Sequence, residues 1–284
     1  MRKKVLLFVS FFIATLLIMA IYSFALGSLS PISPIIIGFD RKIFDRATVY
    51  HHKDIDISKF NIIDNLIKET ENFHQLKFKE KVDIIICNSD NEFARRTLGS
   101  KARLITSPLY GRIFISSKAK AEMDKAKINF LVYLKHELSH SLLFQNMSLY
   151  RSQYFPGWLL EGIAVYSANQ MGVDGYYTKE ETFAKIKAGY FLNPEDWSTT
   201  ILKPQSSNVN KFPLSNKYYF IYSEFGCLVD DLTTRYGREK FQQFLTALLK
   251  DGDVKQIFQH IYGIKFSNYL DDFKKKSEVD MAQH

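Results

Sequence analysis

The stretch LKHELSHSLLF, residues 134–144, places two histidines four positions apart, with a glutamate directly after the first. On an α-helix, residues four apart lie on one face about a turn apart, so His136 and His140 can direct ring nitrogens at one cation. Glu137 projects beside them. The stretch therefore predicts a helix that carries two metal ligands, with an ordinary amphipathic helix as the alternative.

A third candidate ligand lies in GWLLEGIAVYSA, residues 157–168. Glu161 stands inside an apolar helical run, where an unpaired carboxylate is costly, so it must be paired, protonated or bound to a cation. We predict that it ligates the same metal as His136 and His140. Pairing with a lysine or arginine is the alternative. The interval lets a second helix return antiparallel to the first, and Gly162 would let these two helices approach closely.

These motifs resemble those of the gluzincins, zinc metallopeptidases that combine H-E-x-x-H with a glutamate on the following helix. HELSH with WLLEGIAVY is similar to the version in aminopeptidase-N-like enzymes and peptidase-MA-like domains. The resemblance implies a zincin-like fold and one zinc ion per chain. It also implies that His136, His140 and Glu161 are the ligands and that Glu137 is the catalytic base.

By the same resemblance, Tyr222 on a later helix is the counterpart of a tyrosine that stabilises the oxyanion. Two positions depart from the family patterns. The chain has no GxMEN stretch, with which such aminopeptidases hold a free N-terminus, and this favours an endopeptidase. Val165 stands four positions after Glu161, where thermolysin-like enzymes have an aspartate, so the residue that orients a ligand histidine is not identified.

The function predicted from these features is zinc-dependent hydrolysis of peptide bonds in a peptide or protein substrate. The alternative is a membrane-anchored, zinc-binding scaffold of zincin fold without turnover, against which the intact Glu137 argues, because a non-catalytic site needs no base. An extended substrate is expected to pair with an edge strand. The strand predicted for this role is RIFIS, residues 112–116, just before the metal-binding helix.

The periodicity predicts an α+β protein, in which a small mixed sheet with helices precedes a mostly helical half that carries the metal site. The first part spans residues 38–125, with a helix at 58–73, a strand at 81–87 and a hairpin at 102–116. The second part spans residues 126–284. Its helices are predicted at 127–145, 157–169, 179–188, 216–235, 238–250, 253–262 and 266–277, and a long loop at 190–215.

The N-terminus differs from the rest, because Arg2, Lys3 and Lys4 precede an uncharged apolar run at residues 5–26. Such a run is long enough to span a bilayer. Residues 1–27 are therefore predicted to be a signal-anchor, or a signal peptide cleaved after Gly27, followed by a linker at 28–37. The rest of the chain would be extracytoplasmic, either membrane-anchored or secreted and periplasmic.

Composition and charge exclude few classes of protein function. The net charge of +8 suits a domain beside an anionic surface, and no stripe of basic and aromatic residues points to nucleic acid. Cys87 and Cys227 can form one bridge, but two separate buried thiols are the preferred interpretation. The other histidines, His51, His52, His74, His260 and His284, form no ligand pattern and are predicted to be structural or solvated.

Overall fold

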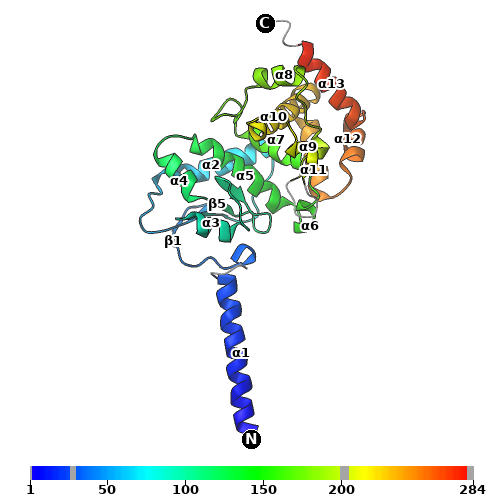
Figure 1. Ribbon diagram of the computed structural model, residues 1–284. Coiled ribbons are helices and arrows are strands. Elements are labelled where there is room, and N and C mark those ends of the chain that lie inside the picture. Colours follow the sequence, from blue (N-terminus) through cyan, green and yellow to red (C-terminus); the bar gives the residue numbers. More distant parts are fainter. Residues whose placement is uncertain (1, 26–29, 199–204, 280–284) are drawn as a thin grey trace.

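The computed structural model describes residues 2–25, 30–198 and 205–279 of the chain. Figure 1 shows three parts in space: the helix α1, a region around a sheet, and a mostly helical region that contains the C-terminal helices. A small mixed sheet followed by a largely helical remainder confirms the α+β class at this level.

The described helices carry these bounds in chain order: α1 (Arg2–Ala25), η1 (Ser30–Ile32), η2 (Ser58–Ile62), α2 (Ile63–His74), α3 (Asp90–Arg96), α4 (Ser117–Asp124), α5 (Phe130–Asn146), α6 (Leu149–Ser152), α7 (Gly157–Ser167), α8 (Lys179–Lys187), η3 (Pro194–Asp196), α9 (Ser207–Asn210), α10 (Lys217–Tyr236), α11 (Arg238–Lys250), α12 (Val254–Tyr262) and α13 (Phe266–Val279). The seven long helices predicted after residue 126 are all present, and the 190–215 segment holds only η3 and α9 among its described residues.

The sheet has the strand order β1-β2-β3-β5-β4. Strands β2, β3 and β5 run parallel, while β1 and β4 pair antiparallel at the two edges. The bounds are β1 (Asp40–Ile43), β2 (Ala47–His51), β3 (Val82–Ile86), β4 (Leu104–Thr106) and β5 (Ile113–Ile115).

The prediction that residues 112–116 form the edge strand is wrong. The strand of that segment, β5, lies between β3 and β4, and β4 is the edge strand on that side of the sheet. The burial of β5 gives the physical reason, because all three of its residues are buried, as in an interior strand covered on both faces. Of the two strands of the hairpin, the first, β4, is at the edge of the sheet, and the second, β5, is in its interior.

Successive residues of a strand point to opposite faces of the sheet, and each face has its own cover. Ile84 of β3 packs in a cluster with residues of α2 and α5. Its neighbour Ile85 packs on the other face with Phe93 of α3. Helix α5, which carries HELSH, therefore lies on the sheet and contacts β4 and β5.

Two glycines let α7 and α10 pack closely in the helical region. A Cβ atom on Gly162 of α7 would stand 2.5 Å from the carbonyl oxygen of Phe225, and one on Gly226 of α10 would stand 2.8 Å from Val165. Gly162 was expected to bring α7 close to α5. Its close neighbour is instead α10, through Phe225 and Val229.

Helix α1 extends away from the rest of the chain (Figure 1). Within the described residues, no helix meets the combination of length and apolar character needed to cross a bilayer. The anchor predicted over residues 5–26 stays a prediction. The cleavage predicted after Gly27 falls on residues 26–29, outside the described part of the chain.

Candidate metal centre

Helix α5 presents His136 and His140 on one face, as their spacing predicts. Their Nε2 atoms lie 3.0 Å apart, and their ring planes are nearly perpendicular, at 87°. Both side chains are buried. Two buried ring nitrogens this close need a proton or a cation between them, because each otherwise directs a lone pair at the other.

Helix α7 brings Glu161 to the same point. Its Oε2 atom lies 3.3 Å from Nε2 of His136 and 3.4 Å from Nε2 of His140. The three residues are buried and their ligand atoms all lie within 4.8 Å of one another, so they form a group that could hold a metal ion. We call His136, His140 and Glu161 the metal group. The ion pairs of Glu161 among the described residues are with these histidines, not with lysine or arginine.

The electrostatics of the group favour the ionised carboxylate. Burial by itself would raise the pKa of Glu161, but the charges and hydrogen bonds of His140 and His136 outweigh burial and lower the pKa to about 2. Burial by itself would lower the pKa of His140, but the negative charge of Glu161 outweighs burial, so the pKa of His140 is raised. A positive charge among these side chains is therefore stabilised by the protein itself.

Gln170, just beyond the end of α7, orients His136. The Nδ1–H of His136 donates a hydrogen bond of 2.7 Å to Oε1 of Gln170, which is fully buried. This bond sets the tautomer that leaves Nε2 free to bind a cation. Val165, the position considered for this role from sequence, packs in the apolar core instead. No local pattern marks Gln170, because it is 34 positions away from its partner.

Glu137 is held by the edge strand. The hydroxyl of Thr106, the last residue of β4, donates a hydrogen bond of 2.6 Å to Oε2 of Glu137. Both side chains are buried, and Glu137 lines the same groove as the two histidines. Sequence reasoning could not identify Thr106, since the contact forms only when α5 packs against β4.

Tyr222 comes from α10, and its ring is nearly parallel to that of His136, with the ring centroids 6.3 Å apart. Burial raises its pKa well above 10, and the negative charge of Glu161 adds to this effect, so its hydroxyl stays protonated. Tyr218 is half exposed, and Tyr219 bonds Arg103. Of the three nearby tyrosines, Tyr222 is the one that lies against the candidate ligands.

A groove of about 1160 Å³ opens over this group. Strand β4 forms one side, the helices α5 and α7 supply the candidate ligands, and α10 supplies Tyr219 and Tyr222 on the far side. Glu137 lines the groove too. A volume of this size can hold several residues of a peptide, and the groove gives the metal group access to solvent.

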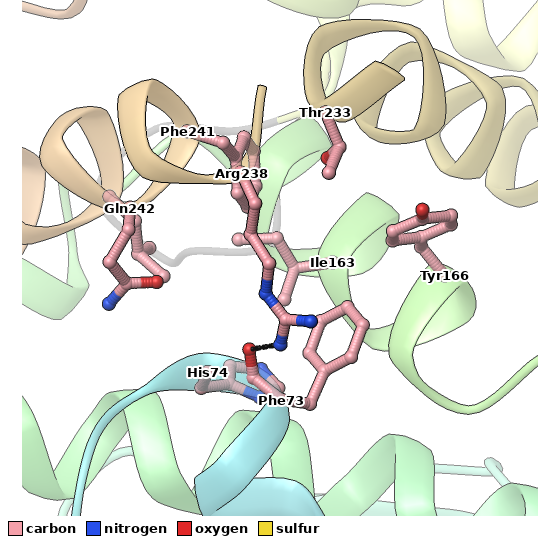
Figure 2. Close-up of a pocket in the computed structure, with 9 residues that line it drawn as sticks. Phe73, His74, Ile163, Tyr166, Thr233, Arg238, Phe241 and Gln242 are labelled. Atoms are coloured by element: carbon pink, nitrogen blue, oxygen red, sulfur yellow. Dashed lines mark hydrogen bonds between the residues drawn. The ribbon is translucent and has the colours of Figure 1, made fainter. Parts of the chain in front are cut away.

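Figure 2 shows a second, much smaller cavity, of about 40 Å³, where α2, α7, α10 and α11 meet. His74 lines it, and Arg238 of α11 crosses it to donate a hydrogen bond to the carbonyl oxygen of Phe73. No candidate metal ligand lines this cavity. At this size it has room for water rather than for a peptide.

Among the described residues, the remaining histidines are not part of the metal group, as predicted. His74 is buried and structural, since its Nδ1–H donates to the carbonyl of Thr70 and its Nε2 accepts from Ser139 of α5. His52 pairs with Glu92 at 3.0 Å. His284 lies outside the described residues. Cys87 and Cys227 are both buried and free, which confirms two separate thiols.

Comparison with known proteins assigns no family. No protein-family model matches the chain. A stretch of 152 residues is 23% identical to the uncharacterized protein YhcO of Bacillus subtilis (strain 168). The match covers 52% of this chain and 42% of that protein, so the chain matches less than half of its relative's length. Identity at this level assigns no activity.

Proposed function

We propose that the protein is a zinc metallopeptidase of the gluzincin type, with a zincin-like fold, that hydrolyses peptide bonds as an endopeptidase. The observation that carries the proposal is the spacing of the donor atoms. Tetrahedral zinc with ligands at 2.0–2.1 Å places neighbouring ligand atoms about 3.3–3.4 Å apart. The atoms of His136, His140 and Glu161 are separated by 3.0, 3.3 and 3.4 Å.

The donor set supports zinc in particular. Two histidines and one glutamate form a known ligand set of catalytic zinc, and three protein ligands leave one position open. Bound there, zinc would act as a Lewis acid that lowers the pKa of a water molecule and polarises a substrate carbonyl. The groove over the group gives substrate a path to it.

Glu137 is positioned to act as the general base. Its carboxylate is fixed by the hydroxyl of Thr106 on one side and by its place on α5 next to His136 on the other. A carboxylate there can accept a proton from an attacking water and pass it to the leaving amine. A scaffold that only held zinc would need neither the base nor its hydrogen bond.

Tyr222 is positioned to donate to negative charge on the reacting carbonyl. Its hydroxyl remains protonated because burial raises its pKa well above 10. It lines the groove beside His136. A hydrogen-bond donor that is already in place when negative charge develops on the carbonyl oxygen lowers the activation barrier of hydrolysis, because the protein need not reorganise.

The free edge of β4 offers the backbone groups that would hold an extended substrate. The backbone atoms of Arg103 and Ser107 bond those of Ser116 and Arg112, which flank β5, at 2.9 and 2.8 Å. Since bonded residues alternate along an antiparallel strand, Leu104 and Thr106 direct their N–H and C=O groups to the free edge. A peptide paired there would run past Glu137, which Thr106 touches.

The test uses the full-length chain purified in detergent. Wild type is expected to carry about one zinc ion per chain and to cleave a mixed peptide library, while His140→Ala loses the zinc. Glu137→Gln should keep the zinc and lose the cleavage, because it removes the base and no ligand. Zinc without cleavage in any preparation would instead support the scaffold, and no zinc at all would refute both.

A further inference from the structure

The groove has an end that the chemistry of the metal group does not use. Strand β4 begins at Leu104, and the free edge leads from Thr106, beside the base, back to Arg103. Three segments meet at this end. They are α3, the loop that follows it, and α4, whose N-cap Ser116 bonds the carbonyl of Arg103 at 2.9 Å.

This end is lined by cations. Arg96, Lys101, Arg103 and Lys118 line it; Arg96 is buried and paired with Glu92, whereas both lysines are exposed. The acidic residues among the described groove-lining residues are Glu137 and Glu161; Glu161 belongs to the metal group and Glu137 lies beside it. The groove therefore has a basic end apart from the metal group, which favours a ligand with negative charge at a distance from the reacting bond.

Arg103 is fixed by an ion pair and by a phenol. Its Nε and Nη2 donate to the Glu122 carboxylate at 2.5 and 3.4 Å, and its Nη1 donates to the hydroxyl of Tyr219 at 3.0 Å. The guanidinium thus presents one edge to a phenol rather than to a carboxylate. Held by both halves of the groove, it is a rigid donor that loses little freedom on binding a ligand.

Tyr133 supplies a donor with no acceptor. Its side chain is 8% exposed, its hydroxyl has no hydrogen-bond partner among the described residues, and it lines the groove. The Arg103 guanidinium lies 5.8 Å from its ring centroid. A buried hydroxyl without a partner is costly, and an acceptor entering the groove would relieve this cost.

We infer that the Arg103 end of the groove binds a carboxylate of the peptide substrate, through Tyr133, Arg103 and the flanking lysines. The inference rests on the proposed peptidase function. It narrows the substrates to peptides that carry an acidic group on the segment that lies against the start of β4. The carboxylate can come from an acidic side chain or from the free C-terminus of the peptide.

The experiment measures binding, so that it does not depend on turnover. Fluorescein-labelled peptides of one sequence are titrated with full-length Glu137→Gln protein in detergent, and anisotropy gives the Kd. One peptide is neutral with an amidated C-terminus, one has a free C-terminus, and one is amidated with aspartates in place of glutamines. At least one carboxylate-bearing peptide is expected to bind about tenfold more tightly than the neutral peptide.

Variants test whether the preference for a carboxylate-bearing peptide arises from the Arg103 end of the groove. Tyr133→Phe and the double variant Lys101→Gln with Lys118→Gln should each reduce the ratio of Kd values, while Lys240→Gln, an exposed lysine of α11, should leave it unchanged. Thermal unfolding checks that each variant is folded. A preference for the free C-terminus alone assigns the chain end, and one for aspartate alone assigns a side chain.

Equal Kd values for all three peptides, or a preference that survives both variants, would overturn the inference. Failure of the proposed function would look different. In that case the wild type would not cleave any peptide, whatever the order of the Kd values.

Discussion

At the scale of single residues, Gln170 sets the orientation of a candidate ligand. It accepts the 2.7 Å hydrogen bond from Nδ1–H of His136, so its loss frees the ring to rotate and to change tautomer. Gln170→Ala is expected to weaken zinc binding about 10–100-fold. Competition with a chromophoric chelator measures the affinity.

Gln243→Ala, on the exposed surface of α11, serves as the control for that measurement and should bind zinc as the wild type does. If Gln170→Ala matched the control, the 2.7 Å contact would have no part in holding the metal.

At the scale of elements, the contact of α7 with α10 depends on Gly162. A methyl group there would stand 2.5 Å from a backbone carbonyl oxygen of α10, which cannot move away as a side chain can. Gly162→Ala should therefore destabilise the fold by about 1–3 kcal/mol, as overpacking does. Urea unfolding measures the change, and Ser167→Ala, at the partly exposed end of α7, should be close to neutral. An unchanged midpoint for Gly162→Ala would show that the helices can separate freely.

His74 joins α2 to the metal-site helix α5, and its titration should make stability depend on pH. Burial lowers its pKa from 6.5 to about 4, so between these values the unfolded chain binds a proton that the folded chain does not. Stability is unaffected by His74 above pH 6.5 and falls as pH decreases through this window, by up to about 3 kcal/mol. Protonation also removes the acceptor for Ser139.

The comparison for this pH effect is His74→Gln, which cannot titrate. The difference in unfolding free energy between the wild type and this variant should shrink or reverse from pH 7 to pH 4. A difference that stays constant across that range would contradict the effect.

At the scale of the whole molecule, α1 presents an apolar surface that the rest of the chain does not cover. Phe11 and Ile18 are 73% and 67% exposed. Apolar surface in water costs about 25 cal/mol per Å², which favours a lipid environment for this helix. We expect the full-length protein to remain in the membrane fraction after alkaline carbonate extraction, and a variant without residues 2–25 to be released. Recovery of the full-length protein in the soluble fraction would exclude the proposed anchor, and zinc binding by the shortened variant checks that it is folded.

The sequence by itself determined which three residues, His136, His140 and Glu161, form a group that could hold a metal ion. Helical periodicity puts His136 and His140 on one face wherever α5 lies, and a lone carboxylate in the apolar run of α7 needs a cationic or metal partner. Both arguments use neighbours within a few turns of one helix, where spacing alone sets the geometry. The same kind of argument found the long helices after residue 126. The two separate buried thiols were predicted from the number and positions of the cysteines.

Only the tertiary structure decided which residues support that group. Gln170 and Thr106 reach His136 and Glu137 because α7 and β4 pack against α5, over separations of 34 and 31 positions. It also decided that β4 is the edge strand and that Gly162 meets α10. These contacts depend on the order in which strands join and on which helix faces meet. Local periodicity does not encode that choice, because a strand or helix with the same pattern can pack in more than one place.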